Sequence, residues 1–288
     1  MPNSSKKPVS VTTKSLVVLD IDGTLLDEEY QSNYPDLTSE ITRLSALGVS
    51  FCINSNRALH DLLPVAQQFN ITGPLIGENG IFVYDPTTNS TGYLLPKEML
   101  GEVESIKENA EKLLYAVLQE QFPNTVVHWI DENTVEAISH HQSSMFEEDS
   151  IVVLNNKYRQ YTVSAHLKQS KATRLISMTE QVSKVAELLS NHPSLPINCT
   201  VNYSQAFGNI LMHSNFISKR TALQKLREIK MYDQIYVIGD ELNDFEMVDG
   251  FGTFLAPNNA EQMAKHAAKH VAKARYTEGV HELLQFIK

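Results

Sequence analysis

Polar and acidic side chains follow three short apolar runs of the chain. Asp20-Ile21-Asp22-Gly23-Thr24 follows the run 16–19, Asn54-Ser55-Asn56-Arg57 follows 49–53, and Gly239-Asp240-Glu241-Leu242-Asn243-Asp244 follows 235–238. The runs are typical of strands buried in a parallel sheet, and ligands of such sheets collect outside the carboxyl ends of the strands. Lys219 begins the helix expected before the third run. We therefore expect four or five carboxylates, a hydroxyl and an amine to converge at one edge.

Crowded carboxylates repel one another, so this arrangement needs either a bound cation or protonation of some of the acids. Mg²⁺ fits best, because it takes one or two carboxylates and shares the oxygens of a phosphorylated ligand, whereas Zn²⁺ favours His and Cys. Glycine and small residues after the strands leave backbone N–H groups for phosphate oxygens. The residues predict a phosphoryl site with magnesium.

The elements that must position these side chains alternate between strand and helix at both ends of the chain. Apolar stripes predict helices around Ile41–Leu47 and Leu59–Phe69, between strands at 49–53 and 74–76 and a hairpin of 81–84 with 93–95. Near the end, a helix from Ala222 precedes strands at 235–238 and 253–255, and helical stripes follow at 260–272 and 279–287. This alternation indicates a parallel sheet with helices on its faces.

The middle of the chain has a different pattern. It predicts a long helix at 97–121, strands at 125–130, 161–166 and 174–178, and a helix at 180–190. We predict an α/β fold in which a doubly wound, Rossmann-like parallel sheet forms a core, with an α/β cap domain inserted in it. The expected division is a flexible tail at 1–14, the core at 15–95 and 217–288, and the inserted domain at 96–216.

Composition excludes several classes of protein. The 288 residues carry 24 basic and 34 acidic side chains, a net charge of −10, which disfavours nucleic acid and anionic lipid as partners. The two cysteines, Cys52 and Cys199, form no Cys-x-x-Cys pair, so a disulfide scaffold or zinc finger is not expected. Residues 1–15 lack the apolar stretch of a signal peptide, and no later stretch is long enough to span a membrane. We expect a cytoplasmic protein without a membrane or nucleic-acid partner.

Four motifs in this order resemble the haloacid dehalogenase superfamily, specifically its phosphatases with a large α/β cap (the Cof-like, sugar-phosphatase-like group). Asp20 to Thr24 matches the first motif, Ser55 the second, Lys219 the third, and Gly239-Asp240 with Asn243-Asp244 the fourth. Glu78-Asn79-Gly80 and Asn259-Ala260 are also typical of that group. The chain departs from it at Asn56 and at Arg220, where many relatives carry Gly.

The resemblance implies a mechanism for these residues. Asp20 would attack phosphorus to form an aspartyl-phosphate, and Asp22 would protonate the leaving alcohol and later activate water. Mg²⁺ would be held by Asp20, the backbone carbonyl of Asp22, and Asp240, with Asp244 orienting a bound water. The phosphoryl oxygens would be bound by Ser55, Asn56, Lys219 and, through the fourth motif, Asn243.

The expected function is hydrolysis of a small phosphorylated metabolite, such as a sugar phosphate or polyol phosphate. Two alternatives remain open on the sequence: a phosphomutase of the phosphomannomutase type, and a non-catalytic phosphate-binding protein. The histidines, His140 and His141 included, are interpreted as surface residues, and the cations of the inserted unit, such as Arg159, as solvated charges. Met145, Met178 and Met212 are expected to pack in the interior, as is Cys52.

Overall fold

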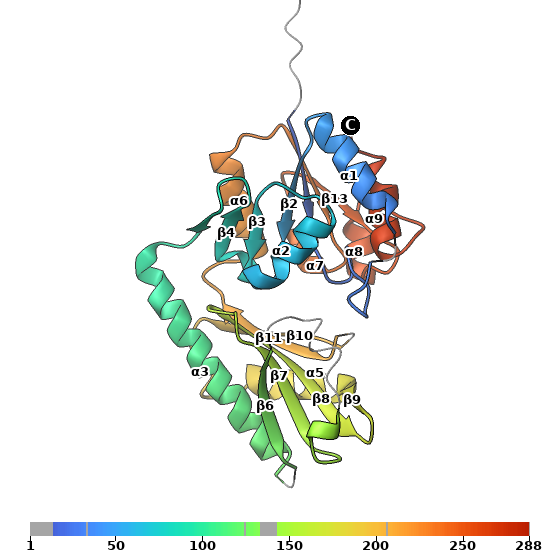
Figure 1. Cartoon of the computed structure of the whole chain (residues 1–288). Helices are drawn as coiled ribbons and strands as arrows, with labels where there is room; N and C mark the ends of the chain where they lie inside the picture. Colours follow the sequence, from blue (N-terminus) through green and yellow to red (C-terminus); the bar gives the residue numbers. More distant parts are fainter. Residues whose placement is uncertain (1–13, 33, 124, 133–142, 206, 288) are drawn as a thin grey trace, which may run out of the picture.

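The structure is a computed structural model that describes residues 14–287 apart from 33, 124, 133–142 and 206. The expected tail and the pair His140-His141 therefore lie outside the described residues, except for Lys14. Two sheets lie one after the other along the long axis of the molecule, and the chain passes from the first sheet to the second and back (Figure 1).

The first sheet contains eight strands from both ends of the described chain. In hydrogen-bonded order they are β14 (His270–Val271), β13 (Thr253–Ala256), β12 (Gln234–Ile238), β1 (Ser15–Leu19), β2 (Ser50–Asn54), β3 (Leu75–Gly77), β4 (Phe82–Asp85) and β5 (Ser90–Tyr93). The first six run parallel, while β4 and β5 add an antiparallel hairpin at one edge. Since β1 lies between β12 and β2, the three polar segments that follow these strands begin side by side.

Helices cover both faces of this sheet because its central strands are apolar on both sides. In β1, Val17 and Leu19 pack into one hydrophobic cluster, and Leu16 and Val18 into another on the opposite face. The first cluster includes residues of α1 (Asp36–Ala46), α2 (Leu59–Gln68) and α9 (Tyr276–Leu284), and the second includes residues of α6 (Lys219–Ile229) and α8 (Gln262–Ala267). Covered on both faces, the sheet is doubly wound, as the sequence predicts.

The second sheet is built from the middle of the chain. Its order is β10 (Cys199–Ser204), β11 (Asn209–Ser214), β8 (Thr162–Lys171), β7 (Ile151–Asn156) and β6 (Val127–Glu132), and β9 (Arg174–Ser177) pairs with β8. Two helices, α3 (Lys97–Gln121) and α5 (Thr179–Ser190), supply residues to the hydrophobic cluster on one of its faces. The sequence predicted both helices and β6, β8 and β9, but missed β7, β10 and β11.

The two faces of the second sheet differ in chemistry because the side chains of β8 alternate in type. Val163, Ala165 and Leu167 pack against the helices. The alternate residues Thr162, Ser164 and His166 are buried polar groups, and the last two line a cavity shared with the first sheet. A polar surface of the inserted unit therefore faces the carboxyl ends of β1, β2 and β12.

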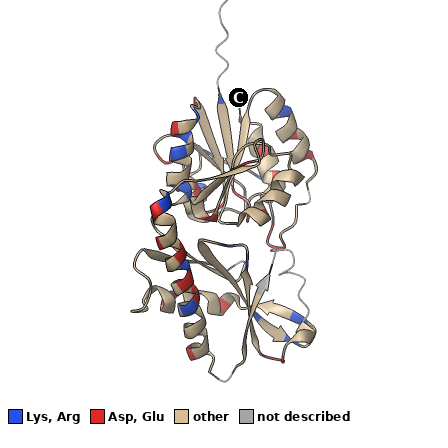
Figure 2. Ribbon diagram, turned by 60° about the vertical axis from the view of Figure 1, so that its left-hand side comes forward, with Lys and Arg blue, Asp and Glu red and all other residues tan. Residues whose placement is uncertain are grey.

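The long helix α3 connects the two units. Leu100 and Val103, in its first two turns, pack into a cluster of the first unit, and Ala110 to Leu118 pack into that of the second. Basic and acidic residues lie close together along this helix (Figure 2). Among the described residues, no helix is long and apolar enough to cross a membrane.

Candidate active site

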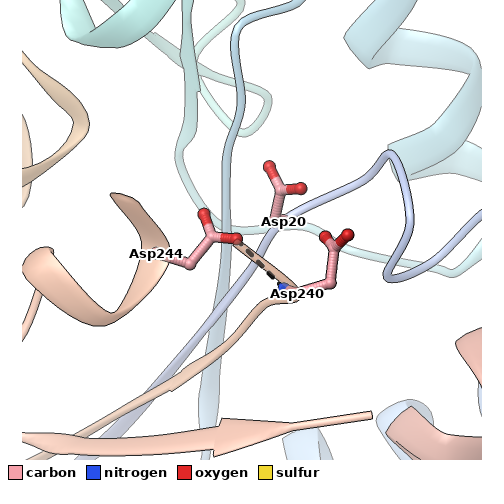
Figure 3. A group of neighbouring side chains, drawn as sticks. All are labelled: Asp20, Asp240 and Asp244. Atoms are coloured by element: carbon pink, nitrogen blue, oxygen red, sulfur yellow. Dashed lines mark hydrogen bonds between the residues drawn. The ribbon is translucent and has the colours of Figure 1, made fainter. Parts of the chain in front are cut away.

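Three carboxylates converge where β1 and β12 end. Asp20 directly follows β1, Asp240 follows β12, and Asp244 lies in α7 (Leu242–Glu246), and one oxygen from each lies within 4.8 Å of the other two. Figure 3 shows the three carboxylate groups turned toward a common centre, with the backbone N–H of Asp240 bonded to Asp244. The parallel register of β1 with β12 accounts for this convergence.

Two glycines make room for the acids. A Cβ atom on Gly23 would lie 2.2 Å from Oδ2 of Asp240, and a Cβ atom on Gly239 would lie 2.3 Å from Cβ of Asp244. Gly23 also has a φ angle of +80°, a backbone conformation that residues other than glycine rarely adopt. Because a Cβ atom has no room at either position, the first motif requires glycine at position 23 and the fourth requires it at position 239.

Lys219 enters this group from the start of α6. Ser218 caps the helix in a reciprocal pair of hydrogen bonds with Thr221, which fixes Lys219 at the first helical position. Its Nζ lies 2.7 Å from Oδ1 of Asp20 and 2.9 Å from Oδ1 of Asp244. The backbone N–H groups of Asp240 and Glu241 donate to the other oxygen of Asp244.

One ammonium group does not balance these acids. Burial raises the pKa of Asp20 to about 8, although Lys219 opposes the rise. Burial and the neighbouring carboxylates of Asp244 and Asp20 raise the pKa of Asp240 well above its ordinary value. A further cation would stabilise the charged forms, and oxygen ligands alone suit a hard ion such as Mg²⁺. The residues thus fit the metal site that the sequence predicts.

Asp22 points to a different partner. The Nε–H of Arg57 donates to Oδ2 of Asp22 at 3.0 Å, and its Nη2–H donates to Oδ1 at 2.7 Å, so the two side chains form a bidentate ion pair. Burial alone would raise the pKa of Asp22, but the charge and hydrogen bonds of Arg57 hold it below its ordinary value. The carboxylate of Asp22 is therefore kept ionised and is not part of the three-carboxylate group.

The expected phosphate-binding residues of the second motif lie in the same cavity as Asp20. Ser55 is buried, and its Oγ accepts a hydrogen bond from the N–H of Arg57 at 3.3 Å. The N–H of Asn56 makes no hydrogen bond with any described residue, so it is free to bind an anion. Asn243 lines the cavity too, with Nδ2 donating to Glu241 at 2.8 Å and a buried Oδ1 that has no partner in the described chain.

The cavity has a volume of about 520 Å³, and its other wall belongs to the inserted unit. His166 and Ser164 of β8 and Asn209 of β11 line this wall. Tyr30, in the loop after β1, packs its ring 5.3 Å from that of Phe207, and both also line the cavity. The site therefore offers carboxylates and a lysine at one end, and aromatic and neutral polar groups together with Arg159 at the other.

Several expectations about individual side chains are wrong. His166 and His213 are buried, not surface residues, because both extend from strands of the second sheet toward the first unit. Arg159 is only 7% exposed, and Met145, expected inside, is 72% exposed. Met178, Met212 and Cys52 are buried as expected. Arg220 is partly exposed and donates to the backbone carbonyls of Glu246 and Asp249, away from the acids.

The sequence reasoning missed the contributions of His166, Ser164, Arg159 and Tyr30 to the cavity. The alternation of polar and apolar residues from Thr162 to Leu167 would have indicated that the strand predicted at 161–166 has one polar face. For Arg159 and Tyr30 the neighbouring residues give no such signal.

Known proteins resemble this chain in sequence or in fold. The sequence profile of haloacid dehalogenase-like hydrolases matches residues 17–284. A 5-amino-6-(5-phospho-D-ribitylamino)uracil phosphatase of Bacillus subtilis, YitU, is 25% identical over 279 residues, covering 95% of this chain and 97% of that protein. A Thermoplasma acidophilum protein of known structure has a TM-score of 0.63 at 19% identity, over 95% of this chain and 97% of the other. A haloacid dehalogenase-like hydrolase of Bacteroides thetaiotaomicron has the same TM-score at 18% identity, over 96% and 100%. The profile match extends over nearly all of the described residues, and the chain belongs to the haloacid dehalogenase-like hydrolases.

Proposed function

We propose that the protein is a Mg²⁺-dependent phosphatase that hydrolyses a small phosphorylated metabolite through an aspartyl-phosphate on Asp20. The observation that carries this proposal is the position of Asp20. Its carboxylate lies at the end of β1, 2.7 Å from the ammonium group of Lys219 and beside two further acids, at the wall of a cavity large enough for a metabolite. The family membership and the activity named for the Bacillus subtilis relative agree with it.

In the first step, a carboxylate oxygen of Asp20 forms a bond to phosphorus while the bond from phosphorus to the ester oxygen breaks. Lys219, Ser55, the N–H of Asn56 and Asn243 would neutralise or bind the phosphoryl oxygens, on which negative charge is concentrated. Mg²⁺, when bound, would be held by Asp20, Asp240 and the backbone carbonyl of Asp22, with Asp244 in support, and would supply positive charge to the same oxygens.

Asp22 would transfer the protons. It would donate one to the leaving alcohol and then accept one from the water that attacks the aspartyl-phosphate, which releases inorganic phosphate and restores Asp20. Its ion pair with Arg57 favours the ionised form, which suits the second step. We expect this pair to open before the first step, when Asp22 must carry a proton.

The inserted unit, residues 96–216, would act as a cap that selects the leaving group. Its polar wall faces the three carboxylates across the cavity and combines aromatic and neutral polar side chains with the cation Arg159. This surface suits a sugar or polyol phosphate. The compound named for the Bacillus subtilis relative carries its phosphate on a ribityl chain that is attached to a pyrimidine, and it belongs among the esters to be tested.

Release of inorganic phosphate from a panel of sugar, polyol and nucleotide monophosphates and that ribitylamino ester tests the proposal, with Mg²⁺ and with EDTA. We expect turnover of at least one ester with Mg²⁺, loss of turnover in EDTA, and none by the Asp20→Asn variant. Asp36→Asn, a change at an exposed aspartate of α1, is the matched control. Full activity in EDTA would contradict the metal assignment, and full activity of Asp20→Asn would contradict the nucleophile. Turnover that depends on a sugar bisphosphate and releases no phosphate would indicate a mutase.

A further inference from the structure

Arg159 is a buried cation of the inserted unit that has no carboxylate partner among the described residues. It lies in the loop between β7 and β8, and its side chain reaches the first unit, where Nη1 donates to the backbone carbonyl of Asn56 at 2.7 Å. The same nitrogen donates to Oγ1 of Thr162 at 2.8 Å. Nε is buried and has no acceptor in the described part of the chain, where no carboxylate oxygen lies within the 4 Å that would make an ion pair with Arg159 either.

The nearby carboxylates are directed to other groups. Glu78 accepts hydrogen bonds from the N–H groups of Gln160, Tyr161 and Thr162. One oxygen of Asp61 accepts from Asn156, and the other is buried without a partner and beyond ion-pair distance of Arg159. The positive charge of Arg159 is thus attracted by Glu78 and Asp61 at longer range, and neither carboxylate contacts it directly.

A buried charge without a direct partner is costly, and an anion in the adjoining space would remove that cost. Arg159 lines the same cavity as Asp20 and Ser55, and it bonds to Asn56, whose N–H is free for an anion. A guanidinium group presents a planar set of donors that matches the oxygens of a phosphoryl group.

We propose that Arg159 donates hydrogen bonds from the inserted unit to the phosphoryl group of the substrate, an inference that rests on the proposed phosphatase function. The phosphate site is then completed by both units. Glu78, by holding the backbone of residues 160–162, positions the loop that carries Arg159. Phosphate binding and the docking of this loop would favour each other, since the bound anion and the docked loop share Arg159.

Binding of inorganic phosphate, in the presence of Mg²⁺, tests this role without requiring turnover. Its dissociation constant is measured by calorimetry, and its inhibition constant is measured wherever an ester is turned over. We expect Arg159→Gln to weaken phosphate binding about 10-fold to 100-fold, and Arg159→Lys to weaken it less because the charge remains. Arg174→Gln, which changes an exposed arginine of β9 in the same unit, is the control and is expected to bind like the unchanged protein.

Unchanged phosphate binding by both Arg159 variants would overturn the proposal. If the Michaelis constant of an ester then rose while phosphate binding stayed constant, Arg159 would contact the leaving group instead. If only the stability fell, in thermal unfolding, Arg159 would be a structural residue of the interface. If the proposed phosphatase function is wrong, the measurements differ from all of these: the unchanged protein would bind phosphate but would release none from any ester.

Discussion

The ammonium group of Lys219 lies 2.7 Å from the carboxylate of Asp20 and is enclosed with it, since the two side chains are only 5% and 8% exposed. The same group also contacts Asp244, whose side chain is fully buried. One lysine therefore stabilises two carboxylates, of which Asp244 is closed to solvent and Asp20 is exposed only toward the cavity. This contact joins the start of α6 to the end of β1, 199 residues away in sequence.

Replacement of Lys219 by methionine removes this charge while keeping most of the apolar stem. Two buried carboxylates then lose their cation, which we expect to lower the free energy of unfolding by about 3 kcal/mol in metal-free protein. Phosphate release should fall at least about 100-fold, because the lysine also neutralises the phosphoryl oxygens. Urea denaturation in EDTA and steady-state kinetics measure the two effects. Lys230→Met, a change at the exposed residue that follows the same helix, should alter neither.

Removal of one acid should separate the stability of the metal-free protein from the affinity for metal. Asp240→Asn relieves repulsion among buried carboxylates, so we expect the variant to be as stable in EDTA as the unchanged protein, or more stable. It also removes a metal ligand, so the rise in melting temperature with added Mg²⁺ should be much smaller. A variant that responds to Mg²⁺ as strongly as the unchanged protein would show that Asp240 does not hold the ion. Asp249→Asn, at an exposed position, is the control.

The sequence was sufficient to predict the convergence of Asp20, Asp240 and Lys219, because it depends on a general property of parallel sheets. Each residue follows or precedes a recognisable buried strand, and β1 lies next to β12. The doubly wound core could be predicted for the same reason.

The contacts across the two units could not be predicted. The bonds from Arg159 to Asn56 and from Thr162 to Glu78 join residues that are 103 and 84 positions apart. They depend on how the second sheet packs on the first, and no local periodicity encodes that packing. The missed strand β10 lies in a segment rich in Asn and Ser, such as Asn202 to Ser204, where the apolar signal is weak. The other missed strands, β7 and β11, contain the apolar runs 151–154 and 210–212, which do carry a strand signal.

Glu78 offers a test of the interface itself. This residue is 2% exposed, and its carboxylate accepts hydrogen bonds from three backbone N–H groups and from the hydroxyl of Thr162, all in the inserted unit. In Glu78→Gln an amide NH₂ replaces one acceptor oxygen and faces N–H donors, so we expect a loss of about 2–4 kcal/mol in the free energy of unfolding. Hydrogen exchange at Tyr161 and Thr162 should become faster.

The control for this change is Glu120→Gln on the exposed side of α3. It removes the same charge from the protein as a whole, so it separates the effect of net charge from that of the lost acceptor. Unchanged exchange at Tyr161 and Thr162 in Glu78→Gln would show that the loop is held by other contacts, and the positioning role of Glu78 would be wrong.

His166 predicts how stability depends on pH. Burial and the positive charge of Lys168 lower its pKa from 6.5 to about 3, although a hydrogen bond with the carbonyl of Phe207 opposes this. Between these two pKa values the unfolded chain binds a proton at His166 that the folded protein does not, so stability falls as the pH is lowered below 6.5. From pH 7.5 to 5.0 this one residue should cost about 2 kcal/mol.

Urea denaturation at the two pH values measures this contribution when His166→Gln is compared with the unchanged protein. The variant cannot take up the proton, so its loss of stability between pH 7.5 and 5.0 should be smaller by that amount, while the carboxylates contribute equally to both proteins. His266→Gln, at an exposed position of α8, should leave the pH dependence as it is. Equal losses in His166→Gln and the unchanged protein would mean that the ring is protonated in the folded state at pH 5.0, and that the polar wall of the cavity carries a positive charge there.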